Sequence, residues 1–192
     1  MTEKKNIFIC LSFLSIFWVY IWGVCANPFQ VSCFSYAGTG DHIQHYLGWI
    51  SYAKDANTDL LSRTFSGWTW PINSKILYFD SIPLLSIIFK PFVSLIGVDF
   101  QYFSIASLAN LIATYYCGLL IGKYFKLKSG LSSLLGILLA LSPIALIRLI
   151  GHESLSLHFL IVYPITLLLI RSVDKWKWSL LIFSSLGTHA YF

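Results

Sequence analysis

Seven side chains that can exchange protons or hold an anion gather in three short stretches of this sequence. They are Asp41, His42 and His45, then Asp80, and finally Arg148, His152 and Glu153. A carboxylate can act as a general base, an imidazole titrates near neutral pH, and a guanidinium can hold a phosphate. Residues of these types can therefore carry out acid–base chemistry.

Asp41 follows the glycine-rich turn 36–40 and precedes a run with helical spacing. The structural interpretation is a helix N-cap that accepts backbone N–H groups, and the functional one is a carboxylate held rigidly beside a membrane. Asp41 and His45 are four residues apart and would share a helix face, as metal ligands can. Two ligands do not make a site, so we predict neither a metal nor another cofactor, with a divalent metal as the open alternative.

Asp80 and the cluster 148–153 lie at the ends of apolar segments. Asp80 or Ser81 can cap a helix that has Pro83 in its first turn. Ionisable groups at a membrane boundary are costly unless they are paired or functional. Arg148 and Glu153 therefore either form an ion pair or belong to a site.

The elements that position these residues are expected to lie in lipid. Of the 192 residues, 57% are hydrophobic and only 11% are charged, whereas soluble domains carry about a quarter charged residues. The basic residues stand in short clusters between apolar runs, which is typical of membrane anchoring and excludes a nucleic-acid partner. The apolar runs long enough to cross are 7–24, 102–121, 131–150, 155–170 and 178–192.

The apolar segment 81–97 is a sixth candidate, but it contains Pro83, Lys90 and Pro91. Proline removes a backbone donor, and a lysine at mid-bilayer costs about 3 kcal/mol on insertion scales. If this segment crossed, the basic clusters 123–128 and 171–177 would both face outside, against the cytoplasmic preference of Lys and Arg. We therefore predict that it is interfacial or re-entrant.

The predicted fold is all-α and integral to the membrane, with about five transmembrane helices, a cytoplasmic N-terminus and a location in the inner membrane. Residues 1–25 form the first transmembrane helix, 26–100 an external loop with interfacial or re-entrant helices, and 101–192 a bundle of four further helices. Cys25 and Cys33 would both lie outside, which leaves a disulfide between them open.

The external loop is too long for a simple connector. Ile43, Tyr46, Leu47 and Ile50 recur at helical spacing and predict a helix lying on the membrane surface. The aromatic stretch 68–79 either anchors the loop at the interface or offers a stacking surface for sugar rings or a polyprenyl chain. This loop is where we expect the site.

Three blocks of the sequence resemble a family of bacterial multi-spanning proteins grouped with the GT-C type glycosyltransferases. The blocks are 40–49 (GDHIQHYLGW), 78–103 with its YFDSIPL, FKP and FQYF motifs, and 151–159 (GHESLSLHF). They occur in the family's order. Members are usually longer, and this chain stops inside an apolar run, so we expect a truncated member.

The resemblance implies a polyprenyl-phosphate-sugar donor, a glycan or lipid acceptor, and an external active site whose catalytic carboxylate matches Asp41. Inverting transfer needs a base for the acceptor hydroxyl and cationic help for the departing phosphate. Asp41 would be that base, with Asp80 or Glu153 supporting or replacing it. The residues expected to contact the substrate are His42, His45, Lys90, Arg148 and His152.

Two other functions stay open. A lipid or glycan transporter would place charged residues along the bilayer, whereas here they gather at one face and no internal repeat is evident. A non-catalytic assembly subunit would use the external loop as a docking surface. In each case the surrounding membrane lipid is a partner.

Overall fold

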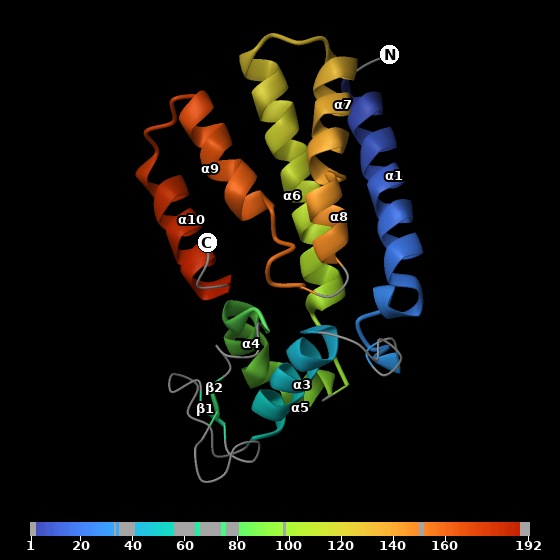
Figure 1. The fold of residues 1–192 in the computed structure, drawn as a ribbon. Coiled ribbons are helices and arrows are strands. Elements are labelled where there is room, and N and C mark those ends of the chain that lie inside the picture. Colours follow the sequence, from blue (N-terminus) through green and yellow to red (C-terminus); the bar gives the residue numbers. More distant parts are fainter. Residues whose placement is uncertain are drawn as a thin grey trace.

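The computed structural model describes residues 3–32, 34, 41–55, 64–65, 74–75, 81–97, 99–149 and 152–188. For residues 41–42, 64–65 and 74–75 it describes the backbone only. The chain forms a bundle of longer helices with a layer of short helices at one end (Figure 1). The expected all-α class is confirmed, with one short strand pair added to it.

The bundle contains six α-helices within the described ranges, of which α7 and α8 form one bent rod. They are α1 (Glu3–Trp22), α6 (Phe103–Tyr124), α7 (Ser129–Ala140), α8 (Pro143–Leu149), α9 (Phe159–Leu169) and α10 (Lys175–Thr188). A single 3-10 turn, η1 (Gly23–Ala26), extends α1. Successive rods run in opposite directions, so the α6–α7 and α9–α10 turns lie at the same end as the N-terminus (Figure 1).

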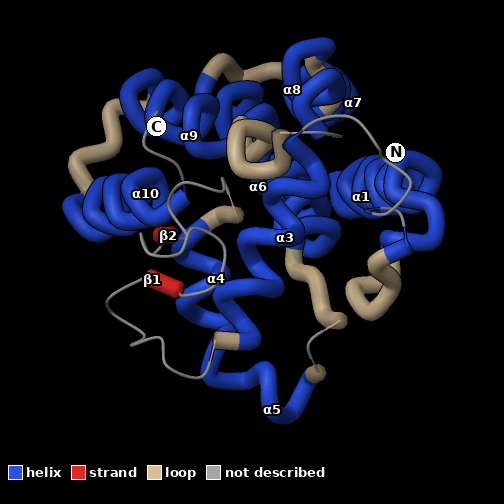
Figure 2. Tube along the Cα trace, turned by 60° about the horizontal axis from the view of Figure 1, so that its bottom comes forward, coloured by secondary structure: helices blue, strands red, loops and turns tan. Residues whose placement is uncertain are grey.

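The layer at the other end is built from short elements. These are α3 (Asp41–Lys54), α4 (Pro83–Phe89), η3 (Lys90–Phe92), α5 (Val93–Ile96) and the antiparallel pair β1 (Thr64–Phe65) and β2 (Ser74–Lys75). Figure 2 brings this end forward and shows α3 and α4 in front of the bundle helices, which are seen nearly end-on. The segment 81–97 thus forms short consecutive helices rather than one long one.

Within the described residues, two helices are long and apolar enough to cross a membrane, Glu3–Ala26 and Phe103–Tyr124, and a third span arises if α7 and α8 count together. The α7–α8 pair is bent by 45°, because Pro143 at the start of α8 cannot donate to the preceding turn. This bent pair occupies the predicted span 131–150. The finding supports a membrane protein, and the count of five spans stays a prediction.

The predicted fourth span, 155–170, begins later than expected. Its helix α9 starts at Phe159 and has only 11 residues, or roughly 16 Å at the usual rise per residue. The connection between α8 and α9 is correspondingly longer than the gap between the predicted spans 131–150 and 155–170. Residues 152–158 form a series of turns, and most of their side chains are buried.

Large apolar side chains cover the outside of the bundle. On α1 only Asn6, Leu14 and Trp22 are buried, while Phe8 is 71% and Tyr20 81% exposed. Water-exposed apolar area on this scale is unusual for a soluble monomer. The outward face of α1 therefore suits contact with lipid.

Small residues bring α6 and α7 into close contact. A Cβ added to Gly118 would lie 2.3 Å from the Cα of Gly136, and one on Gly122 would lie 2.4 Å from Oγ of Ser132. Gly118 and Gly122 are four residues apart and form the small-xxx-small pattern that lets membrane helices approach closely. This close contact was not predicted from the sequence.

Candidate functional site

A histidine–glutamate pair joins the end layer to the bundle. Nδ1 of His45, on α3, donates to Oε2 of Glu153, in the turns before α9. His45 is 0% and Glu153 2% exposed, so the pair is sealed from solvent. Both are predicted site residues, and Glu153 was expected either to form an ion pair with Arg148 or to belong to a site. Within the described ranges Arg148 forms no ion pair, and Glu153 contacts His45 instead.

The buried side of α3 differs from the predicted one. His45, Trp49 and Tyr52 are fully buried, whereas the predicted apolar face of Tyr46, Leu47 and Ile50 is only partly so. The helix packs against α4 and against the start of α6. Its inner side is polar as well as aromatic, because Trp49 Nε1 donates to the Phe100 carbonyl at 2.7 Å and His45 donates to Glu153.

A chain of hydroxyl groups links α3 to α4 and α6. Ser81 Oγ donates to the His45 carbonyl at 2.6 Å, and the Tyr102 hydroxyl donates to the Ser81 carbonyl. Ser86 Oγ lies 2.6 Å from the Tyr102 hydroxyl and 3.0 Å from the Ser81 carbonyl. All three of these side chains are completely buried. The carbonyl and hydroxyl groups at this junction therefore satisfy one another.

Ile82, next in the chain after Ser81, has a left-handed backbone with φ of 46°. A β-branched residue adopts this conformation only where the surroundings impose it. Its side chain is 1% exposed and lies in the apolar core of the end layer. The strain thus lies beside the hydrogen bond that connects α4 to α3.

Lys90 caps the C-terminal end of α3. Its Nζ donates to the carbonyls of Tyr52 at 2.7 Å and Asp55 at 3.0 Å, and it lies 4.2 Å from the centroid of the Tyr52 ring. A cation is favourable at a helix C-terminus, where carbonyl groups lack partners. Partial burial lowers the pKa of Lys90, and the nearby Asp55 raises it by less. Lys90 was predicted to contact substrate. The contacts that the structure shows are instead with the end of α3.

The turns before α9 are held to α6 by a side chain. Asn110 Oδ1 accepts the backbone N–H of Phe159 at 2.9 Å, and Ser156 Oγ donates to the Glu153 carbonyl at 2.8 Å. Ser154 Oγ and Nε2 of His158 are buried without a partner among the residues that the structure describes. Nε2 of His158 therefore forms no hydrogen bond within this part of the chain.

The remaining predicted site residues are placed as follows. Asp41 is the first residue of α3, one helical turn before His45. The side chains of Asp41 and His42 are not among those that the structure describes, and Asp80 lies outside the described residues. Arg148 is half-buried in the last turn of α8, and His152 is exposed. Cys25 is disulfide-bonded, while Cys33 lies outside the described residues.

The structure brings together His45 and Glu153, but it places Lys90 at the opposite end of α3. Sequence reasoning missed Ser86, Tyr102 and Asn110, which hold the junction. Their signal was weak, because a hydroxyl or amide inside an apolar run is common. Among the residues with described side chains, no group of three His, Cys, Asp or Glu gathers as a metal site requires.

An apolar pocket of about 300 Å³ lies beside the junction, between α4, α6 and α10. Leu85 and Phe89 of α4, Ile105 and Ala109 of α6, and Leu157 line it. Ile82 and Tyr102 line it as well, so the pocket touches the same residues that connect α3 to the bundle. Its lining suits a hydrocarbon chain better than a polar ligand.

The family model described as a domain of unknown function (DUF6311) matches residues 9–192. No curated protein and no solved structure gives a significant match to the chain.

Proposed function

This chain belongs to the DUF6311 family, and on that premise we propose that it is a membrane glycosyltransferase-like protein that uses a polyprenyl-phosphate-linked sugar. The transfer would take place at the end of the bundle that carries α3. The acceptor would be a glycan or a lipid. The proposal rests on the arrangement of the three sequence blocks that resemble GT-C type transferases.

The observation that carries the proposal is that all three blocks meet at one junction. His45 comes from the block 40–49, Ser81 and Tyr102 from the block 78–103, and Glu153 from the block 151–159. Direct hydrogen bonds join His45 to Glu153, Ser81 to His45, and Tyr102 to Ser81. Segments more than a hundred residues apart in the chain thus form one polar cluster, which is how active-site surroundings are commonly assembled.

Asp41 is the residue that this cluster would position. It begins the helix that His45, Trp49 and Lys90 fix at successive turns. A general base works only when it is held within hydrogen-bond reach of the proton that it removes. Three anchors along one helix supply such rigidity. Glu153, being sealed from solvent, would be a positioning residue and not a group that touches substrate.

In the proposed reaction, the acceptor hydroxyl oxygen attacks the anomeric carbon of the donor sugar. Asp41 takes the hydroxyl proton, and the bond between the anomeric carbon and the phosphate oxygen breaks, leaving polyprenyl phosphate. Arg148 and the exposed His152 are the cationic candidates for the departing phosphate. The apolar pocket between α4, α6 and α10 would hold the first isoprene units of the donor.

The test is sugar transfer from a labelled polyprenyl-phosphate donor by the purified protein in detergent. Asp41→Asn keeps the helix cap and removes the base, so we expect the rate to fall about a hundredfold or more. Asp99→Asn is the matched control, since Asp99 is an exposed aspartate in the same end layer. Transfer by Asp41→Asn at the control rate would contradict the proposal.

A second candidate function is a non-catalytic assembly subunit. The burial of both His45 and Glu153 favours it, because a sealed pair can stabilise a docking surface without meeting any substrate. Under this hypothesis, Glu153→Ala would break the pair and abolish assembly with the partner, whereas Asp41→Asn would still assemble. Loss of sugar transfer with assembly retained would favour the enzyme.

A further inference from the structure

A second pocket lies at the end of the bundle opposite α3, between α1, α6 and α7, with a volume of about 470 Å³. Its lining contains both polar and apolar side chains. Lys123, Lys126 and Ser129 belong to the polar part, and Ile7 and Leu119 to the apolar part. A pocket with both kinds of lining matches a ligand that has a charged head and a hydrocarbon tail.

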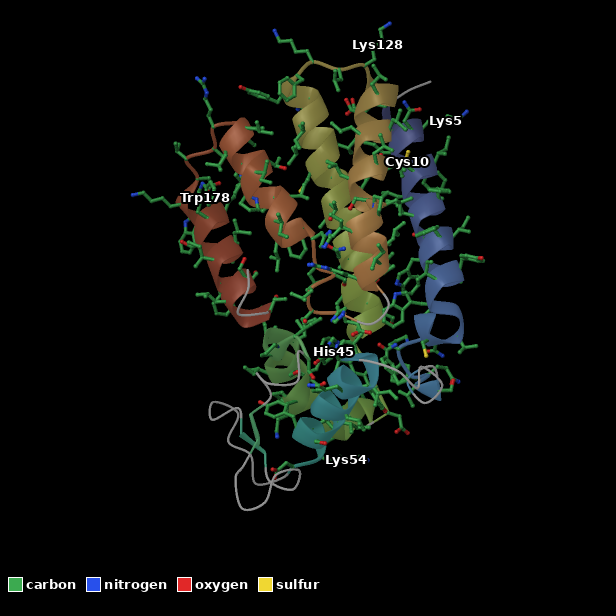
Figure 3. The ribbon with its side chains drawn as sticks, in the orientation of Figure 1. Lys5, Cys10, His45, Lys54, Lys128 and Trp178 are labelled. Carbon is green, nitrogen blue, oxygen red and sulfur yellow. The ribbon has the colours of Figure 1, made fainter. Side chains whose placement is uncertain are left out.

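The electrostatics of this end favour an anion. Lys4, Lys5 and Lys128 are exposed around the pocket residues, and Figure 3 shows Lys5 and Lys128 at the end opposite His45 and Lys54. Within the described ranges, neither Lys123 nor Lys126 forms an ion pair. Two lysines that line one pocket therefore keep their charge available for a ligand.

Ser129 adds a hydrogen-bond donor. Its Oγ accepts a bond from Nδ2 of Asn6 at 3.0 Å, which leaves its own hydroxyl hydrogen free to donate. The pocket also contains Glu3, which would repel a bare phosphate but can accept a bond from a hydroxyl group. A phosphate that carries a glycerol headgroup satisfies the lysines, the serine and the glutamate together.

The backbone holds Lys126 in an unusual conformation. Lys126 follows the last residues of α6 with φ of 54°, and its N–H donates to the Lys123 carbonyl while that of Leu127 donates to the Gly122 carbonyl. This is the Schellman motif, in which glycine is the usual residue at the left-handed position. Arg171 has the same conformation, with φ of 53°, in the equivalent motif after α9.

We propose that the pocket between α1, α6 and α7 binds an anionic phospholipid through its phosphate and glycerol headgroup. Lys123 and Lys126 contact the phosphate, Ser129 donates to it, and Glu3 accepts from a headgroup hydroxyl. The acyl chain lies along Ile7 and Leu119. This site is independent of the proposed sugar transfer, which belongs to the other end of the bundle.

The test is native mass spectrometry of the full chain in detergent, titrated with phosphatidylglycerol or with phosphatidylcholine of the same acyl chains. We expect phosphatidylglycerol to bind more tightly, and Lys126→Gly to weaken it about fivefold, the effect of one lysine near a lipid phosphate. Glycine suits the left-handed position, so this variant keeps the turn. Arg171→Gly is the matched control, with the same backbone change and the same loss of charge outside the pocket, and we expect wild-type binding.

Three results would overturn the proposal. Lys126→Gly and Arg171→Gly could bind phosphatidylglycerol equally well, which would make the effect one of net charge only. Phosphatidylcholine could bind as tightly as phosphatidylglycerol. Inorganic phosphate at millimolar concentration could displace the lipid, which would identify a site for free anions instead.

Discussion

His45 and Glu153 are 108 residues apart in the chain, yet they form the polar contact at which the end layer meets the bundle. Their local sequence settings allowed either a surface pair or a site, and only the tertiary structure decides between these. Because both side chains are buried, neither can be satisfied by water if the other is removed. The pair is therefore a requirement of the fold as well as a support for α3.

Removing one member of this pair should destabilise the protein. Glu153→Ala removes the contact between Glu153 and the buried imidazole of His45, and we expect a loss of about 3 kcal/mol or more in the free energy of unfolding. Thermal unfolding in detergent measures it, with Asp99→Asn as an exposed control. In a double-mutant cycle with His45→Ala, the double variant should lose less than the sum of the single ones. Additive losses would show that the two side chains do not interact.

Lys90 provides a second prediction at this scale, about pH. Burial lowers the pKa of Lys90 below its ordinary value of 10.5, so the folded protein releases this proton before the unfolded chain does. Stability from this residue therefore increases as the pH rises toward 10.5 and is lost as the pH falls through the folded pKa. The stability difference between wild type and Lys90→Met should widen over that interval. A stability difference that stays constant or shrinks as the pH rises would contradict a lowered pKa of Lys90.

At the scale of elements, periodicity predicted most helices and missed the details of their ends. The helix from Asp41 was predicted from apolar spacing, but its buried side depends on Trp49 and His45 meeting residues of α6 and of the turns before α9. Residues 152–158 carry enough apolar positions to resemble the start of a helix. The helix α9 instead starts at Phe159, whose backbone N–H donates to Asn110 of α6. Contacts between distant segments are not visible in local spacing.

The α6–α7 contact gives the prediction at this scale. In Gly118→Ala the new Cβ would meet the Gly136 backbone at 2.3 Å, so the helices must separate, and we expect a loss of about 1–3 kcal/mol in stability. Gly130→Ala on α7 is the control, because nothing lies within 4 Å of its Cβ. The melting temperature of both variants checks this. Equal melting temperatures would mean that the helices pack less closely than the structure indicates.

At the scale of the whole molecule, the two ends of the bundle differ in chemistry. One end carries lysines and the amphipathic pocket between α1, α6 and α7, and the other carries the buried polar junction and the apolar pocket beside α4. Figure 3 places Lys5 and Lys128 at the first end and His45 and Lys54 at the second. Composition and charge pattern were sufficient to predict that the basic clusters 123–128 and 171–177 gather at one end and the candidate site at the other. They could not predict which polar residues pair, since that depends on packing.

The directions of the bundle helices bear on the predicted topology, in which five crossings stay a prediction. Successive rods alternate in direction, and the basic turns after α6 and after α9 lie at the same end (Figure 1). Excess Lys and Arg favour the cytoplasmic side, which would leave α3, Asp41 and the junction on the external side. The proposed sugar chemistry requires that orientation.

Labelling of single cysteines in intact cells tests this central claim most directly. Cys10→Ser and Cys117→Ser first remove the free thiols of the described part of the chain. In this background, Lys54→Cys and Lys126→Cys are made one at a time, and the cells are treated with a thiol reagent that cannot cross membranes. Lys54→Cys should be labelled in intact cells, and Lys126→Cys only after permeabilisation. Labelling of Lys126→Cys in intact cells, with Lys54→Cys protected, would contradict the account.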